Sequence, residues 1–162
     1  QYAPGVVPYP EIENDSGLLP LTMEEQAVVS SSIPGREWIY ALDHSMLTWW
    51  QPEEEDETPT FMVDLRGLFD ISAVRLIWRD VGLDYENGIL PGPFRYRIEA
   101  TEREQPEGFV TVLDCSQNKT DYVVDYRTFP VVNARYVRLC IDGCPVGIRP
   151  GVISFAVFGK HG

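Results

Sequence analysis

Short runs of alternating hydrophobic and polar residues fill the C-terminal part of the chain. In the run at 71–78 (ISAVRLIW), Val74, Leu76 and Trp78 fall on one side of an extended chain, and Arg75 falls on the other. Similar runs occupy residues 60–65, 94–100, 109–114, 121–126, 135–142 and 152–158. Turn-forming residues separate these runs and no amphipathic helix is evident, so the pattern predicts an all-β, antiparallel sandwich or barrel.

The N-terminal residues have a different texture. Residues 1–25 hold four of the 13 prolines and show no periodicity. Proline-rich, aperiodic sequence is typical of linkers and extended arms. We therefore expect an arm or linker at 1–27 that packs along a single folded domain at 28–160.

Length and composition are those of one globular domain. The chain has 162 residues, of which 44% are hydrophobic, so it can bury one core and extensive disorder is not expected. No run of about 18 apolar residues, the length that spans a bilayer, occurs. The chain starts at Gln1 without a signal-peptide pattern, and we interpret it as a mature or excised part of a longer polypeptide.

Charge restricts the expected partners. The net charge is −12. So acidic a surface repels phosphate backbones and anionic lipid headgroups, and we expect neither nucleic acid nor a membrane as a partner. Neutral ligands remain open. The acidic run at 53–57 is interpreted as a solvated loop.

The three cysteines leave two interpretations open. Cys140 and Cys144 are separated by Ile-Asp-Gly, a turn-forming sequence, and could form a small disulfide, although so short a loop is geometrically demanding. Reduced and buried thiols are an equally good interpretation. No Cys/His spacing typical of a zinc site is present, with Cys115 standing apart from both histidines.

An ordered set of motifs resembles a known family. Its parts are residues 30–32 in VVSSSI, Ala41, Asp43, Thr48 and Trp50 in ALDHSMLTWWQP, 63–65 in FMVDL, 71–78 in ISAVRLIW, 134–139 in ARYVRL and 157–159 in VFG. No single motif is specific, but their order over residues 28–159 resembles the discoidin domain, also called the coagulation factor C-type domain, and family 32 carbohydrate-binding modules. The segments PGPFRYRIEA and DYRTF look most like modules appended to bacterial glycoside hydrolases.

The resemblance implies an antiparallel jelly-roll β-sandwich of about eight strands. It also implies a non-catalytic carbohydrate-binding module that targets an attached glycoside hydrolase to a neutral plant polysaccharide. Such a module is expected to be secreted, extracellular and monomeric, with its catalytic domain covalently linked. Trp50 matches a core position of the family, which leaves Trp49, on the other side of an extended chain, nearer to solvent.

The resemblance also implies a calcium loop. In the family, an Asp-Gly-Asp-x-x-Thr motif surrounds a structural calcium ion, which takes about 6–8 oxygen ligands. Asp43, Ser45 and Thr48 are the candidate ligands here. Ser45 stands where an acidic residue is common, Ser154 where the last strand usually supplies a Glu, and His44 replaces the usual Gly. The alternative is a hydrogen-bonded loop in which Asp43 caps backbone amides.

No motif indicates catalysis. Asp43, His44 and Ser45 are consecutive, so their side chains cannot converge as a triad requires. The other histidine, His161, lies beside the C-terminal Gly162, and no glycine-rich phosphate loop is present. No spacing singles out a pair of carboxylates among the 25 acidic residues. We therefore do not expect an enzyme.

Aromatic and polar side chains in two loops and one turn are the candidate sugar ligands. Sugars stack on aromatic faces, while charged and amide groups bind their hydroxyls. The candidates are Trp38 and Tyr40 in the loop 34–40, Arg79, Asp80, Tyr85 and Asn87 in the loop 79–88, and Arg149 in the turn before the last run. Each also has a structural interpretation: Trp38 could be covered by the N-terminal arm, and Tyr85 could plug the end of the sandwich.

Two classes of function follow. The first is a carbohydrate-binding module appended to a plant-polysaccharide-degrading enzyme. The second is a structural or interaction domain that braces a catalytic domain and has no sugar site of its own. A cell-surface adhesion domain is disfavoured, because the net charge is wrong for anionic lipid.

Overall fold

The computed structural model describes residues 19–21 and 27–161. Its elements are β1 (Leu19–Pro20), β2 (Ala27–Val29), the 3-10 helix η1 (Trp38–Ala41), β3 (Thr60–Val81), the 3-10 helix η2 (Tyr85–Asn87), β4 (Arg95–Thr101), β5 (Val110–Cys115), β6 (Val124–Gly143) and β7 (Arg149–His161). All strand pairs are antiparallel. Neither 3-10 helix in these residues is long and apolar enough to cross a membrane. The predicted all-β class is confirmed.

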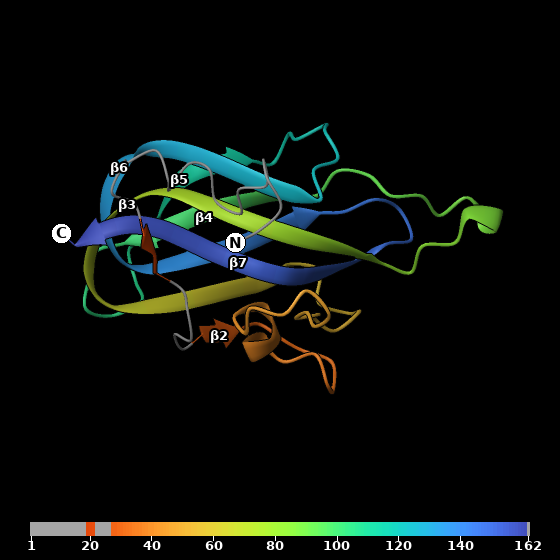
Figure 1. The fold of residues 1–162 in the computed structure, drawn as a ribbon, viewed down its shortest axis with the longest axis horizontal. Helices are drawn as coiled ribbons and strands as arrows, with labels where there is room; N and C mark the ends of the chain where they lie inside the picture. The colour runs from red at the N-terminus through yellow and green to blue at the C-terminus, as the bar shows by residue number, and fades with distance from the viewer. Residues whose placement is uncertain (1–18, 22–26, 162) are drawn as a thin grey trace, which may run out of the picture.

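Two long strands belong to both layers of the sandwich. Residues 60–64 of β3 pair with β2 and with residues 136–140 of β6, whereas residues 69–77 of β3 pair with β7 and with residues 124–134 of β6. β4 and β5 continue the first layer, and β1 continues the second beyond β7. Figure 1 shows β3 running along one side in olive, turning at the end where the C-terminus lies, and returning in yellow-green. The predicted sandwich is therefore confirmed, with seven strands because β3 and β6 each serve twice.

The turn of β3 between the layers is visible in its backbone. The register with β6 shifts between Asp64 and Phe69, and Arg66 within this interval has a φ of 63°. A residue with a side chain rarely adopts a positive φ, so the conformation needs local support. Asp64 provides it by accepting hydrogen bonds from Arg66 N at 2.8 Å and from Arg135 Nε at 3.1 Å. The carboxylate thus ties the bend to β6.

The core lies between the two layers, as the alternation predicts. Phe61 from the first layer meets Phe155 from the second at a ring-centroid distance of 5.6 Å, and Trp50 lies 5.2 Å from Phe61. All three side chains are fully buried, so the expected core role of Trp50 is confirmed. Val74 and Leu76 point into the same core.

One charged group is buried within the sandwich. Asp125 accepts hydrogen bonds from Tyr96 Oη at 2.8 Å and from Arg127 Nε at 2.5 Å, and only 2% of its surface is exposed. Burying a carboxylate is costly unless such partners satisfy it. Burial, followed by the charge of Asp125, raises the pKa of Tyr96, so its hydroxyl stays protonated and keeps donating.

Part of the predicted N-terminal arm belongs to the sheet. Leu19 and Pro20 pair with Gly159 and Phe158 of β7, and β2 begins at Ala27. The sheet therefore includes residues before position 28, where we expected the domain to begin. The remainder of the predicted arm, 1–18 and 22–26, lies outside the described residues.

The cysteines are free thiols. Cys140 Sγ donates to Glu99 Oε1 at 3.4 Å, while Cys144 Sγ donates to the carbonyl oxygen of Ile148 at 3.0 Å. The small disulfide considered above is not formed, because the two side chains have different partners. Burial, together with the nearby charge of Glu99, raises the pKa of Cys140 to about 11, which keeps this thiol protonated at neutral pH.

Replacing the central tryptophan tests this core. Because Trp50 is fully buried and contacts Phe61, Trp50→Ala should lower the free energy of unfolding by about 3–5 kcal/mol. Leu47→Ala, in the same loop but 85% exposed, is the matched control and should change it by less than about 0.5 kcal/mol. Urea titration followed by tryptophan fluorescence measures both. Equal effects of the two substitutions would contradict the assignment of Trp50 to the core.

Candidate functional site

The segment around Trp50 runs beside the edge of β7. Trp50 N donates to Val152 O, and Val152 N donates to Trp50 O, both at 2.9 Å. Gln51 N in turn donates to Arg36 O at 3.1 Å, so the chain around Arg36 lies on the far side of this segment. These bonds extend the sheet beyond β7 and fix the direction in which each side chain points.

Trp49 faces away from the core, as predicted, and two arginines pack against its ring. The Cζ atom of Arg36 lies 3.6 Å from the indole centroid, and that of Arg79 lies 4.2 Å from it. The backbone of Arg36 bonds to Gln51 on the side that faces away from β7, whereas Arg79 belongs to β3, on the far side of β7. The two guanidinium groups therefore approach the ring from opposite directions. We call Arg36, Trp49 and Arg79 the arginine–tryptophan row.

Gly151 on β7 allows the Trp49 ring to lie close to the β7 backbone. A Cβ atom on Gly151 would stand 2.9 Å from Trp49 Cδ1 and 3.2 Å from Arg79 Cβ, so a side chain at this position would push the row outward. The indole nitrogen of Trp49 donates to Gln51 Oε1 at 3.1 Å. The ring therefore rests on the β7 backbone with its polar atom satisfied within the protein.

Arg149 lies on the same face as the row. Arg79 pairs with Gly151, and Val81 pairs with Arg149, in the antiparallel register of β3 and β7. Paired residues share a face, and so do residues two apart along a strand. Arg149 makes a 3.5 Å contact to Glu54, and 45% of its side chain remains exposed. The structure thus brings together two of the predicted ligand residues, Arg79 and Arg149.

Asp80 lies between Arg79 and Val81 on β3 and therefore points to the other face. Burial, and then the charge of Asp121, raise the pKa of its carboxyl group. Asp80 does not face the arginine–tryptophan row, although it is adjacent to Arg79 in sequence.

Tyr85 and Asn87 lie on η2, in the loop that projects beyond the sandwich in Figure 1. Tyr85 is 66% exposed, so it does not plug the end of the sandwich. The side-chain amide of Asn87 donates to Asp84 Oδ2 at 2.6 Å, and Asp84 Oδ1 accepts from Asn87 N at 3.3 Å. The ring of Tyr85 is therefore available to a ligand, whereas the amide of Asn87 is committed to closing its own turn.

Trp38 and Tyr40 lie on η1, in a separate part of the structure. Trp38 is partly buried against the core. The carbonyl oxygen of Tyr40 accepts from Thr48 Oγ1 at 3.5 Å. Because η1 and η2 are far apart in Figure 1, the seven predicted ligand residues do not form one contiguous site.

The loop suggested for calcium is closed by hydrogen bonds. Thr48 Oγ1 donates to Asp43 Oδ2 at 2.6 Å, and Ser45 N donates to Asp43 Oδ1 at 3.1 Å. Ser45 Oγ accepts from Leu47 N at 3.1 Å. His44 has a φ of 62°, which explains why glycine is common at this position in the family that the sequence resembles.

The oxygen ligands that this loop offers do not fit a calcium ion. Calcium takes about 6–8 hard oxygen ligands, but the loop offers one carboxylate, Asp43, and both of its oxygens accept hydrogen bonds from protein donors. Within residues 19–21 and 27–161, no group of three or more His, Cys, Asp or Glu side chains is placed to hold a metal ion.

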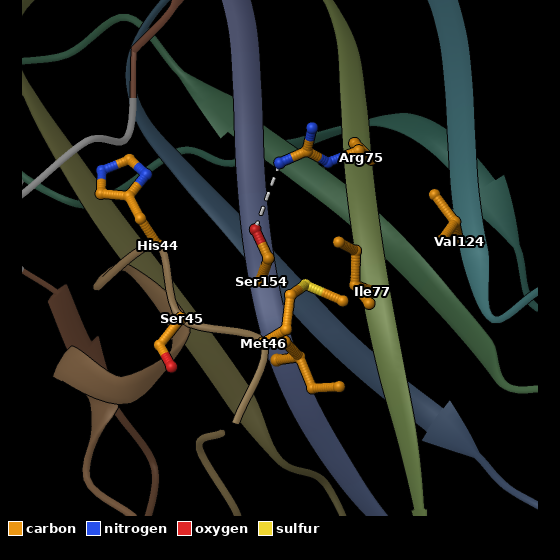
Figure 2. Close-up of a pocket in the computed structure, with 8 residues that line it drawn as sticks. His44, Ser45, Met46, Arg75, Ile77, Val124 and Ser154 are labelled. Atoms are coloured by element: carbon orange, nitrogen blue, oxygen red, sulfur yellow. Dashed lines mark hydrogen bonds between the residues drawn. The ribbon is translucent and has the colours of Figure 1, made fainter. Parts of the chain in front are cut away.

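A surface hollow of about 310 Å³ lies beside the same loop. It is lined by His44, Ser45, Met46, Arg75, Ile77, Val124, Ile153 and Ser154. Figure 2 shows Arg75 extending from β3 towards Ser154 on β7, where its Nη2 donates to Ser154 Oγ at 3.4 Å. A guanidinium group therefore contacts the position at which the family usually has a glutamate, which further disfavours a cation here.

A second hollow of about 310 Å³ is lined in part by Arg149. Its remaining charged lining residues are all acidic, namely Glu53, Glu54, Asp56 and Glu57. Asp56 is tied down by Ser31, whose hydroxyl donates to Asp56 Oδ2 at 2.7 Å. The acidic run at 53–57, which we interpreted from the sequence as a solvated loop, thus forms one wall of this hollow.

The sequence did not predict that Arg36 and Arg79 pack on the ring of Trp49. The alternation of Trp49 and Trp50 predicts that Trp49 lies outside the core, and Arg36 belongs to a loop already considered for binding. No local signal places these residues against Arg79, which is 43 positions after Arg36 in the sequence. The row becomes visible only once the long-range pairing is known. The segment of Trp49 and Trp50 pairs with β7, the segment of Arg36 bonds to Gln51, and Arg79 lies on β3 beside β7.

Comparison with known proteins identifies the fold. No family model and no curated protein matches the chain. Among solved structures, chitosan-binding module 1 derived from chitosanase/glucanase from Paenibacillus sp. IK-5 is 23% identical with a TM-score of 0.72, covering 87% of this chain and 99% of the module.

Two further solved modules hold sugars. Chitosan-binding module 2 of the same Paenibacillus enzyme, in complex with chitotriose, is 22% identical with a TM-score of 0.71, over 86% of this chain and 99% of that one. CpGH89CBM32-5 from Clostridium perfringens, in complex with GalNAc-beta-1,3-galactose, is 17% identical with a TM-score of 0.70, over 87% and 100%. The chain has the fold of the discoidin-like carbohydrate-binding modules.

Proposed function

We propose that this chain is a non-catalytic carbohydrate-binding module that holds an attached glycoside hydrolase on its polysaccharide outside the cell. The observation that carries the proposal is the arginine–tryptophan row, with Arg149 on the same face, where β3 ends and β7 begins. The fold supports it, because modules of this fold have been solved with chitotriose and with GalNAc-beta-1,3-galactose.

The chemistry of these side chains suits a sugar. A guanidinium group presents its donors in one plane and can bind two neighbouring hydroxyls at once. Stacking on Trp49 restricts the orientation of the Arg79 guanidinium group, so this side chain loses less conformational freedom when a ligand binds. Tyr85, at the tip of the loop that follows β3, offers an exposed ring to a further unit of an extended glycan.

A role without catalysis agrees with the placement of the acidic and nucleophilic side chains. Asp43, His44 and Ser45 follow one another in a loop, and the carboxylate of Asp43 is occupied by Thr48 and by a backbone amide. The proposal therefore assigns catalysis to the linked hydrolase domain, and this chain acts by raising the local concentration of substrate.

We also propose that hydrogen bonds, rather than a calcium ion, hold the loop at 43–48. Thr48 and Ser45 satisfy both oxygens of Asp43, and Arg75 contacts Ser154, where a ligand carboxylate would be needed. Such a loop keeps its conformation without a metal, because its polar groups have partners within the protein.

Affinity electrophoresis against a panel of plant polysaccharides tests the binding function. At least one glycan should retard the protein, and Arg79→Gln should weaken that binding at least tenfold, about 1.4 kcal/mol, with little change in melting temperature because Arg79 is exposed. Arg103→Gln, an exposed arginine on the 101–108 loop, is the matched control and should bind as the parent does. If no glycan retards the parent protein, a domain that only braces its neighbour is the better description.

The projecting loop allows a separate test. Tyr85→Ala should weaken binding of a long oligosaccharide by about 1–3 kcal/mol, the contribution of one buried aromatic face, while the melting temperature stays nearly constant because the ring is 66% exposed. Isothermal titration calorimetry with short and long oligosaccharides measures the loss. Unchanged affinity for every chain length would show that the tip takes no part in binding.

Chelation tests the loop at 43–48. Because its hydrogen bonds need no ion, excess EDTA should leave the melting temperature unchanged, and added calcium should not raise it. Asp43→Ala should lower stability equally with and without EDTA, since it removes the acceptor of both hydrogen bonds. A chelator-dependent shift that disappears in Asp43→Ala would instead show that the loop binds calcium.

A further inference from the structure

We propose that the arginine–tryptophan row binds a negatively charged group, a carboxylate or a sulfate, of an acidic polysaccharide. The inference rests on the proposed carbohydrate-binding function and names the class of sugar that the site takes. The geometry that carries it is the convergence of two guanidinium groups on the indole ring of Trp49.

The two charges are held close together. Because their Cζ atoms lie 3.6 and 4.2 Å from the same ring centroid, Arg36 and Arg79 are separated by no more than about 7.8 Å. Like charges at this distance repel, and stacking on the indole ring, which favours cations over its face, keeps them in place. An anion that reaches both guanidinium groups past the edge of the ring would relieve the repulsion.

Within residues 19–21 and 27–161, the charges of this pair are not neutralised by the protein. In the part of the chain that the structure describes, no carboxylate forms a salt bridge with Arg36 or Arg79. Six other arginines do form salt bridges, namely Arg97, Arg103, Arg127, Arg135, Arg138 and Arg149. Although the chain has 25 acidic residues, those that the structure describes leave these two adjacent cations without a salt bridge, so both are available to a ligand.

A third guanidinium group adds to the positive charge of this face. Arg149 shares the face, and its 3.5 Å contact to Glu54 joins two exposed side chains, the kind of pair that contributes little. Asp80, the acidic residue next to Arg79 in sequence, points to the other face. Three guanidinium groups therefore lie on this face, next to the acidic wall formed by Glu53, Glu54, Asp56 and Glu57.

The net charge of the chain and the charge around the arginine–tryptophan row predict different kinds of ligand. The expectation of a neutral polysaccharide follows from the net charge of −12. Interactions between exposed charges are largely screened beyond a Debye length of about 8 Å at physiological ionic strength. An anionic group bound at the row responds to the nearby arginines more than to remote acidic residues. Guanidinium groups bind carboxylates and sulfates through paired, parallel hydrogen bonds, which fixes the orientation of the ligand.

The test compares polymers that differ only in charge. Polygalacturonic acid should retard the protein in affinity electrophoresis, and the fully methyl-esterified polymer, which lacks the charge, should retard it at least tenfold less. A sulfated galactan and its desulfated form make the second pair and show which anion the site takes. Retardation by the preferred acid should decrease as salt is raised, because the contact is between charges.

Single-charge variants locate the contact. Arg36→Gln and Arg79→Gln should each weaken binding of the acidic polymer at least tenfold. Lys160→Gln is the matched control, since it removes one exposed positive charge at the far end of β7 from Arg149, and it should bind as the parent does. Gly151→Ala, which would place a Cβ 2.9 Å from Trp49 Cδ1, should also weaken binding by displacing the row.

The outcomes separate the inference from the function on which it rests. If the methyl-esterified and desulfated polymers bind as well as the acidic ones, the module binds carbohydrate but the row does not select a charge. If acidic polymers bind but Arg36→Gln and Arg79→Gln bind equally well, the anion site lies elsewhere and the inference is wrong. If no polymer of either kind binds, the proposed function itself fails.

Discussion

The pairing of Trp50 with Val152 is the interaction on which the candidate site depends. Two 2.9 Å backbone hydrogen bonds fix the register of the loop segment against β7. With that register, the Trp50 side chain enters the core and Trp49 must lie on the outer face, because successive side chains of an extended chain point to opposite sides. A slip by one residue would turn Trp49 inward and Trp50 outward and would shift both along β7, so neither ring would keep its present contacts with Phe61 or with the two arginines.

The long strands β3 and β6 make this arrangement stable. Each contributes to both layers, so the two halves of the sandwich are joined by continuous backbone as well as by the contacts of Phe61 with Phe155. The bend of β3 requires an unusual backbone conformation at Arg66, and Asp64 supports it. The opposite end of β3 has a register shift against β7 between Ile77 and Trp78, after which Arg79 pairs with Gly151.

Charge is distributed unevenly over the molecule. Most arginines on the outer faces are paired with carboxylates, as in the contacts of Glu99 with Arg97 and Arg138. Arg36 and Arg79 are stacked on an aromatic ring instead. Pairs of the first kind hold strands together, whereas guanidinium groups of the second kind keep donors available. A net charge of −12 therefore describes the chain as a whole and not the face where β3 ends and β7 begins.

The sequence determined the all-β class, the alternation that buries Val74 and Leu76, and the opposite orientations of Trp49 and Trp50. These features depend on a period of two residues, which is local and can be read from neighbouring positions. The sequence also showed that the 43–48 loop departs from the motif of the family that it resembles, because the departure is a change of residue type. Only the tertiary structure decided which polar residues meet. Arg36, Trp49 and Arg79 lie in three segments that come together because each pairs with its neighbour in the sheet, and the register of such long-range pairing is set by the packing of the whole core.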